Sequence, residues 1–199
     1  MKKRLGFSLL IAQVLFVILL PVWVQLTSYL HSTVIVVIWF CLSFISLFIG
    51  CWLADIKLLI AARTFKLAIF AYGIALLILL FFRPNSSHNT INLIPLETIR
   101  FYLSGEVDLL IALYNIGANI GLFIPFGLYY RYIKFKPTFT EISLLTIGSI
   151  SLIELLQFLT GRGSLDVDDL FLNVIGVTTG YIIYPVFKKV LVVRNNAQL

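Results

Sequence analysis

The chain of 199 residues is 60% hydrophobic and only 12% charged, with 15 lysines and arginines against 9 acidic residues. A soluble domain of this length could not bury so much apolar surface, so the composition excludes a soluble globular protein and indicates a bilayer as solvent. The net charge of +6 does not indicate a nucleic-acid partner, because the basic residues lie in short clusters between apolar runs.

Six apolar runs approach the length of about 20 residues that a transmembrane helix needs. The predicted spans are 6–29, 33–54, 67–82, 109–130, 141–160 and 170–187. The first run has no small-residue cleavage site after it, so we interpret it as a retained helix rather than a signal peptide. The predicted fold class is all-α, a polytopic membrane helix bundle with about six transmembrane helices.

The positions of the basic residues predict the orientation of the bundle. With the N-terminus inside, four inner segments hold three lysines or arginines each, which is 12 of the 15 in the chain. Only Arg83, Arg100 and Arg162 then lie outside. The opposite orientation would reverse this count, so the positive-inside rule predicts that both termini are inside, N-in and C-in.

The longest outer loop, 83–108, carries an apolar part over residues 91–103. This part is too apolar for a free loop and too short to span the membrane. Its composition favours an interfacial or re-entrant segment near 91–103. The alternative is a loop packed on the bundle.

Polar side chains inside three predicted spans fall at a similar depth below the outer surface. Glu154 lies six residues before the end of its span, which is about 9 Å at the rise of an α-helix. Asn115 lies about 10 Å, and Asn173 about 6 Å, inward from the ends of their spans. Asn119 is one turn from Asn115, and Gln157 shares a face with Glu154. This coincidence predicts one pocket that opens outward.

We predict that eight residues of this region contact a ligand. They are Asn115, Asn119, Glu154, Gln157, Arg162, Asp166, Asp169 and Asn173. For the amides, the alternative is hydrogen bonding between helices of the bundle. Glu154 is harder to explain as packing, since ionisable side chains inside membrane helices are costly and default to a functional interpretation.

Arg162 is the nearest cation to Glu154, in the turn just after the fifth predicted span. A carboxylate in a low-dielectric medium tends to hold its proton unless a cation pairs with it. Arg162 has three other possible partners: Asp166, Asp169 or an anionic head group.

The acidic turn of Asp166, Asp168 and Asp169 has two interpretations. Together with Glu154 it could bind a divalent cation, since hard cations prefer several oxygen ligands. The turn lacks a diagnostic metal spacing, however, and Asp168 and Asp169 also suit the N-terminus of the following helix. We therefore predict no metal and no other cofactor.

Gly176 and Gly180 form a small-xxx-small pair on the face of Asn173. Such pairs let two helices approach closely. We interpret these glycines as architectural.

Three motifs follow one another in the second half of the chain. They are Asn-Leu-Ile-Pro-Leu-Glu-Thr-Ile (92–99), Asn-Ile-Gly-Ala-Asn-Ile-Gly-Leu-Phe-Ile-Pro-Phe-Gly (115–127) and residues 151–176, which contain Glu-Leu-Leu-Gln and Gly-Arg-Gly-Ser-Leu-Asp-Val-Asp-Asp. In this order they resemble the VanZ-like family, with Ala118 where the family often has glycine. The resemblance covers about residues 67–187 and leaves the first two spans outside.

The resemblance implies three regions and a location. Residues 1–66 form two N-terminal transmembrane helices, 67–187 a VanZ-like membrane domain, and 188–199 a cytoplasmic basic tail. The family's namesake is an accessory factor in glycopeptide resistance that lowers susceptibility to teicoplanin-type antibiotics. We therefore expect a multi-pass protein of the cell membrane, part of the cell envelope, whose site faces the extracellular side.

Three functions compete. The favoured one is binding or shielding at the outer leaflet, with a membrane lipid, a lipid-linked cell-wall precursor or a lipoglycopeptide antibiotic as partner. The alternative is an enzyme acting on a lipid-linked cell-envelope substrate, with Glu154 as catalytic acid or base. No nucleophile or hydrolase motif is evident, which disfavours it. A transporter needs a polar route to the inner side, and the inner halves of the spans are nearly free of charge.

Overall fold

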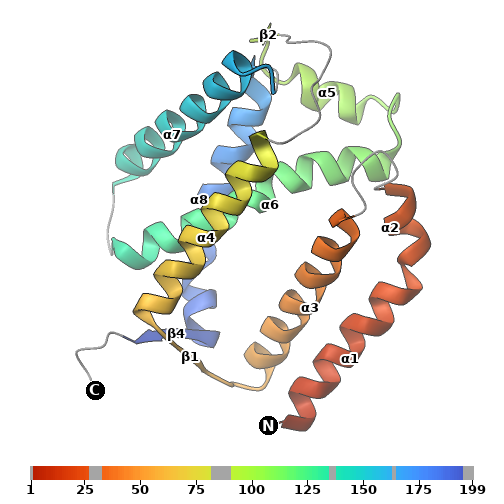
Figure 1. Ribbon diagram of the computed structural model, residues 1–199, viewed down its shortest axis with the longest axis vertical. Helices are drawn as coiled ribbons and strands as arrows, with labels where there is room; N and C mark the ends of the chain where they lie inside the picture. Colours follow the sequence, from red (N-terminus) through yellow and green to blue (C-terminus); the bar gives the residue numbers. More distant parts are fainter. Residues whose placement is uncertain (1, 27–32, 82–90, 135–137, 163–164, 195–199) are drawn as a thin grey trace. The chain divides into compact units, whose positions relative to one another are not determined.

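The computed structural model describes residues 2–26, 33–81, 91–134, 138–162 and 165–194, and these residues are mostly helical (Figure 1). The chain divides into two compact units: Met1–Ala62 with Val186–Leu199, and Arg63–Pro185. Each unit is described by itself below. A predominantly helical chain agrees with the all-α class that the sequence predicts.

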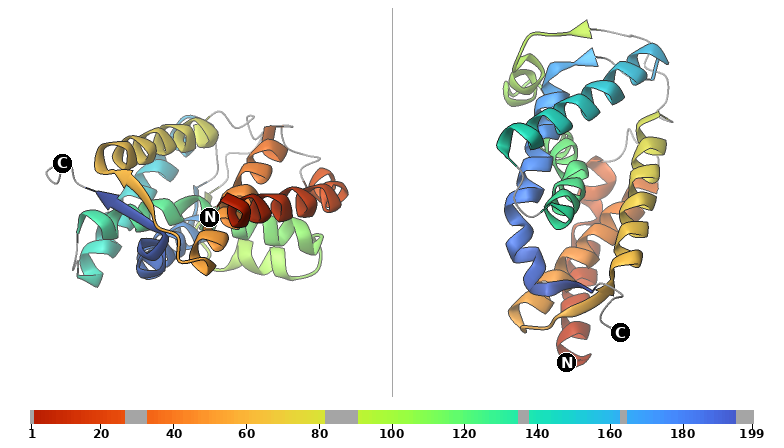
Figure 2. Two further views of the ribbon diagram at one scale, coloured as in Figure 1. Left: turned by 90° about the horizontal axis from the view of Figure 1, so that it is seen from below. Right: turned by 90° about the vertical axis from the view of Figure 1, so that its left-hand side faces the viewer.

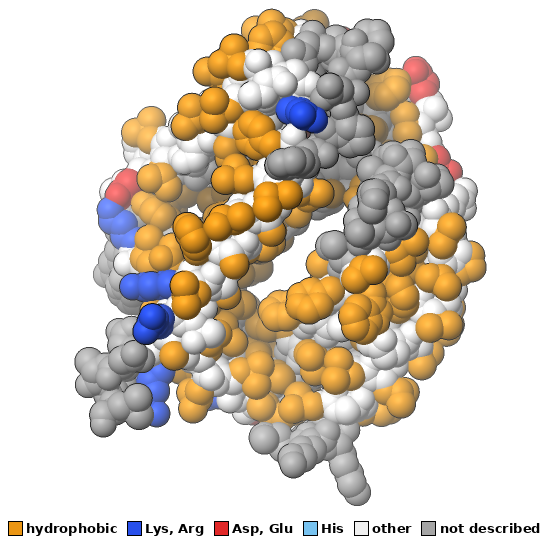
Figure 3. All heavy atoms as spheres, in the orientation of Figure 1, with side chains coloured by type: hydrophobic (Ala, Val, Ile, Leu, Met, Phe, Trp, Pro, Cys, Tyr) orange, Lys and Arg blue, Asp and Glu red, His pale blue; other side chains and the backbone are white. Residues whose placement is uncertain are grey.

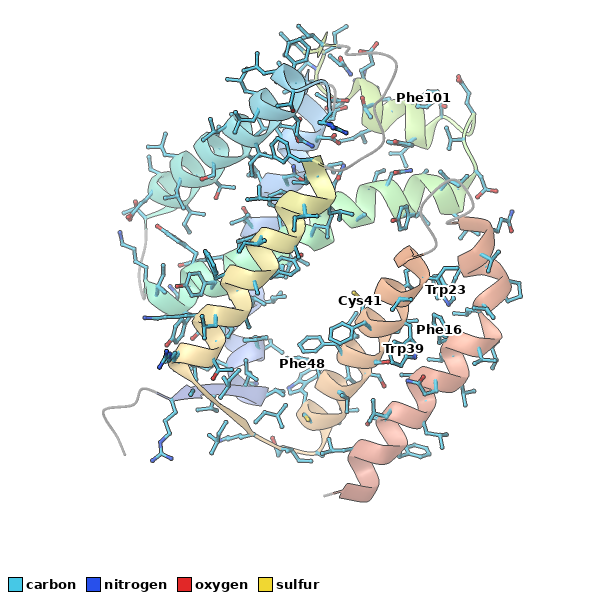
Figure 4. The ribbon with its side chains drawn as sticks, in the orientation of Figure 1. Phe16, Trp23, Trp39, Cys41, Phe48 and Phe101 are labelled. Atoms are coloured by element: carbon cyan, nitrogen blue, oxygen red, sulfur yellow. The ribbon has the colours of Figure 1, made fainter. Side chains whose placement is uncertain are left out.

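The first unit contains apolar helices joined by a few polar contacts. Helix α1 (Lys2–Ile18) continues past Leu19 into α2 (Leu20–Leu26), and α1 packs on α3 (Thr33–Leu53). The indole N–H of Trp39 donates to Gln13 at 2.6 Å, and Figure 4 shows Trp39 between α1 and α3. Hydrogen bonds of this kind help to join helices in a lipid environment, where the hydrophobic effect does not drive them together.

A short parallel strand pair also belongs to the first unit. Strand β1 (Leu58–Ala61) pairs with β4 (Leu191–Arg194), with Leu58 opposite Leu191. The sequence predicts only a basic tail over 188–199, because four-residue apolar runs carry no periodic signal of their own. Residues 195–199 of that tail lie outside the described residues.

The second unit is built around four long helices and a short docked segment. Its elements are α4 (Ala62–Phe81), β2 (Ile91–Asn92), α5 (Glu97–Leu103), α6 (Leu109–Ile133), α7 (Phe139–Leu159), β3 (Leu165–Asp166) and most of α8 (Val167–Val190). Local capping fixes two of the helix starts. The Asp108 carboxylate accepts from the Leu110 N–H at 2.8 Å, and the Thr138 hydroxyl accepts from the Glu141 N–H at 3.3 Å.

Within the described residues, four helices are long and apolar enough to cross a membrane. They are Ala62–Phe81, Leu109–Ile133, Thr140–Leu159 and Val167–Val190. They coincide with the last four predicted spans, apart from a start at Ala62 instead of residue 67. Leu5–Ile18 and Ile38–Leu53 are shorter apolar helical stretches inside the first two predicted spans, and residues 27–29 of the first are not described.

Large hydrophobic side chains remain exposed on all of these long helices, and they cover much of the face seen in Figure 3. The four long helices of the second unit meet in a small core of Leu76, Phe123, Ile150 and Val177, one from each. An apolar exterior around a compact apolar core fits helices whose solvent is lipid. The structure thus supports a helical membrane protein.

Helices α6 and α8 approach each other closely along a row of glycines. A Cβ atom on Gly176 would collide with the Ile120 carbonyl oxygen, and one on Gly180 with the Ile124 carbonyl oxygen. Gly127 faces the carbonyl of Val177 from the other side. The prediction that Gly176 and Gly180 permit close packing is therefore confirmed, and α6 is the partner helix.

Candidate functional site

The segment 91–103 is fixed to the start of α8 rather than free. Strand β2 pairs in parallel with β3, and this pairing sets Asn92 opposite Asp166. Figure 2 shows the two strands side by side above the first turn of α8, with α5 next to them. The first and third motifs of the chain thus meet in one place, which is the candidate site.

Asp168 holds the N-terminus of α5 in position. Its carboxylate accepts from the backbone N–H of Leu96 at 2.6 Å and from that of Ile99 at 3.0 Å. Leu96, the residue before α5, has a φ of 67° and supplies no side-chain cap of its own. A carboxylate is favourable at this end of a helix, because the free N–H groups and the helix dipole are both positive there. The Asp168 side chain, which belongs to α8 and is only 1% exposed, therefore caps the N-terminus of α5.

Asp166 also links the segment 91–103 to α8, through hydrogen bonds of its carboxylate. One carboxylate oxygen caps α8 by accepting from the Asp168 N–H at 2.9 Å, and the other accepts from the Thr98 hydroxyl at 2.6 Å. The Thr98 hydroxyl in turn accepts from the Asn92 amide at 3.1 Å. Asn92, Thr98, Asp166 and Asp168 form a connected network, which we call the α5 clamp.

The hydrogen bonds of the α5 clamp give Asp166 and Asp168 of the acidic turn a structural role. The carboxylates of Asp166 and Asp168 receive hydrogen bonds from protein donors, as the helix-capping interpretation requires. Among the described residues there is no group of three or more His, Cys, Asp or Glu side chains arranged to hold a metal ion. Asp168 and Asp169 lie in the first turn of α8, as the sequence suggested, and Asp166 caps that turn.

Asp169 and Glu154 bring α6 and α7 to the edge of the clamp. The Asn119 amide donates to the Asp169 carboxylate at 2.7 Å, which links α6 to the first turn of α8. Glu154, 7% exposed, lies near the carboxylates of Asp169 and Asp166. A buried acid therefore lies beside two others, which is an unfavourable arrangement unless a proton or a cation is held there.

The remaining predicted amides have separate environments. Gln157 donates to the Leu80 carbonyl of α4 at 3.2 Å, which is the interhelical hydrogen bonding named as its alternative role. Asn115 donates to the carbonyl of Ile111 in its own helix at 2.9 Å. Asn173 is 5% exposed, and its side-chain oxygen is buried without a hydrogen-bond partner among the described residues. It is therefore an acceptor that a ligand or a water could satisfy.

Arg162 lies in the turn that follows α7, next to Gly161, whose φ of 69° gives the chain its reversal. Its backbone N–H donates to the Gln157 carbonyl at 2.8 Å, and its side chain is half-buried. Within the described part of the chain, its guanidinium makes no hydrogen bond or ion pair. Glu154, Asp166 and Asp169, the three acids considered as its partners, do not neutralise it.

Three residues of the clamp were not among the predicted ligand contacts: Asn92, Thr98 and Asp168. A signal for two of them was present, since Asn92 and Thr98 are, with Glu97, the polar side chains of an otherwise apolar motif. What the sequence could not provide was their partner, because the pairing of β2 with β3 joins residues about 70 positions apart.

Four apolar helices around a small core and a polar cluster at one end of α7 and α8 define a helical membrane protein. The family model described as VanZ/LLP1 matches residues 67–188, more than half of the chain. The chain belongs to this family, and the resemblance noted over 67–187 is confirmed. No curated protein and no solved structure matches the chain.

Proposed function

We propose that this VanZ/LLP1 protein spans the cell membrane six times, with both termini inside and the candidate site at the outer side. The distribution of lysine and arginine supports this orientation. In the proposed organisation, residues 1–66 add two spans to the family domain of 67–187, and 188–199 remain on the inner side. Fusing a reporter enzyme after residue 199 tests the C-terminal location. If a reporter that works only outside the cell is active in this fusion, the proposed inner location of the C-terminus is contradicted.

The proposed function is to bind a lipid, a lipid-linked cell-wall precursor or a lipoglycopeptide at the outer leaflet, and so to lower susceptibility to teicoplanin-type antibiotics. The observation that carries this proposal is the Arg162 side chain, which is half-buried and whose guanidinium makes no hydrogen bond or ion pair with a described residue. Arginine presents planar paired donors that suit a phosphate or carboxylate. Ligands of these classes all combine such an anionic group with a lipid tail.

The α5 clamp supports a route for the lipid tail. Leu93 and Ile94, just before α5, are 63% and 62% exposed, while the clamp fixes the backbone around them. Exposed aliphatic side chains on a fixed segment suit the boundary between head groups and acyl chains. In the proposed arrangement, Arg162 contacts the anionic group, and residues 91–103 line the entrance.

Arg162→Ala tests the proposal in cells that depend on this protein for reduced teicoplanin susceptibility. The variant is expected to reach the membrane at wild-type levels but to abolish protection, because the anion loses its bidentate donor. Lys188→Ala is the control, since Lys188 is an exposed cation in the last turn of α8, outside the clamp and outside the segment 91–103. Unchanged susceptibility with Arg162→Ala would reject the binding role.

The alternative of a membrane enzyme rests on Glu154. A buried carboxyl beside two carboxylates is an arrangement that can hold and release a proton during a reaction. In that case Glu154→Gln should stop turnover of a lipid-linked substrate while binding persists, as measured on the purified protein. Glu154→Gln with full activity would exclude a proton-transfer role but would leave the binding proposal intact.

A further inference from the structure

One face of α4 combines two cations with an apolar stripe. At 100° per residue, Arg63, Lys66, Leu67, Phe70 and Ile74 all project within an arc of about 100°. All five side chains are exposed, and Phe70 is 68% exposed. In Figure 3 hydrophobic side chains run along α4, with basic side chains at its start. We call these five residues the α4 face.

The opposite side of α4 is the one that packs on the protein. Phe65 and Leu76 are buried, and the Tyr72 hydroxyl donates to the Leu122 carbonyl of α6 at 2.8 Å. These three residues lie about half a turn away from the α4 face. The second unit therefore leaves the α4 face unused in its own packing.

Aromatic rings surround the basic end of α4. The Phe65 ring contacts the rings of Tyr129 and Tyr132 at the end of α6, with centroids 6.0 and 5.1 Å apart. Amphipathic aromatic rings favour the level of the lipid head groups. This end of α4 is thus suited to the depth at which a phospholipid carries its phosphate.

The cations of the α4 face are available to a partner. Neither Arg63 nor Lys66 forms an ion pair with another described residue, and no acidic residue lies in the first turn of α4. The neighbouring Lys134 is instead paired with Glu141. Two exposed cations without an ion-pair partner among the described residues complement an anionic group rather than a zwitterionic one.

We propose that the α4 face binds an anionic phospholipid. Arg63 and Lys66 contact the head-group phosphate, and an acyl chain lies along Leu67, Phe70 and Ile74. The continuous apolar stripe selects a lipid over a soluble anion, because a soluble anion would gain nothing from it. This site is separate from Arg162 and does not depend on the function proposed for the outer cluster.

Competitive lipid retention tests the proposal. The full-length protein is reconstituted with equal amounts of phosphatidylglycerol and phosphatidylcholine, extracted in mild detergent, and its retained lipids are quantified by mass spectrometry. Wild type should be enriched in phosphatidylglycerol. The double variant Arg63→Gln/Lys66→Gln should lower that enrichment by about fivefold or more, since each cation near an anionic surface contributes to lipid attraction. Lys134→Gln, which removes a cation that is already paired with Glu141, should leave it unchanged.

Two further arms separate the sources of the signal. Phe70→Ser should reduce the amount of retained lipid without changing the preference for phosphatidylglycerol, because it alters only the apolar stripe. Displacement of the retained phosphatidylglycerol by millimolar inorganic phosphate would overturn the proposal in favour of a soluble-anion site. Equal retention of both lipids by wild type, or a Phe70→Cys variant that crosslinks to another helix of this chain, would also overturn it.

Discussion

Helix α8 is held in two contrasting ways along its length. Its middle meets α6 through Gly176 and Gly180, where backbone lies against backbone. Its first turn holds α5 through the carboxylates of Asp166 and Asp168. This contact between α6 and α8, which we call the glycine seam, permits only one packing geometry of the two helices. The clamp, in contrast, consists of hydrogen bonds that can open and re-form. A site that admits a ligand is therefore expected beside the clamp and not where the glycines of α8 meet α6.

The largest effect is expected at the seam. Gly176→Leu should destabilise the protein by about 3 kcal/mol or more, because the new side chain collides with the backbone of Ile120, which cannot move aside. Thermal unfolding in nanodiscs measures the loss. Gly117→Ala is the matched control: a Cβ there meets nothing within 4 Å, so the change should be neutral or stabilising by up to about 1 kcal/mol. Equal losses in both variants would contradict a tight α6–α8 seam.

Opening the clamp should have the next largest effect. Asp168→Asn keeps the size of the side chain but sets an amide N–H against a backbone N–H at the start of α5. The expected loss is about 2 kcal/mol, typical of a charge-assisted hydrogen bond left unmade in a buried site. Limited proteolysis within 91–103 should also become faster. Asp108→Asn, at the exposed cap of α6, should change stability by less than half as much.

The sequence predicts this molecule best where the signal is periodic or local. The sequence indicates the last four spans by apolar length, the close-packing glycines by their spacing, and the acidic turn by its charge. Each of these signals lies within one continuous segment. The β1–β4 and β2–β3 pairs are not visible, since they join distant residues through only two to four positions. For the same reason, the sequence does not indicate whether Asn115 or Asn119 is the partner of Asp169; in the structure it is Asn119.

A smaller effect is expected within the clamp at Thr98. Thr98→Val removes one donor to the Asp166 carboxylate and should cost about 1 kcal/mol in thermal unfolding. Thr98→Ser restores the hydroxyl and should recover most of the loss. Failure of serine to recover stability would indicate that the methyl group, and not the hydrogen bond, is what matters at this position.

The smallest effect on stability is expected at Arg162. Arg162→Ala should change the free energy of unfolding by no more than about 0.5 kcal/mol, because the guanidinium makes no hydrogen bond or ion pair with a described residue. The same variant is expected to abolish protection against teicoplanin. A large loss of stability would instead make Arg162 part of the structural framework.

The central claim is that the polar cluster around the first turn of α8 is divided between the structural α5 clamp and a separate binding group, Arg162. Amide hydrogen exchange at Leu96 and Ile99, measured in wild type, Asp168→Asn and Arg162→Ala, tests it most directly. The account predicts that Asp168→Asn speeds exchange at both amides while Arg162→Ala leaves them at the wild-type rate. Unchanged exchange in Asp168→Asn, or equal acceleration in Arg162→Ala, would contradict the division.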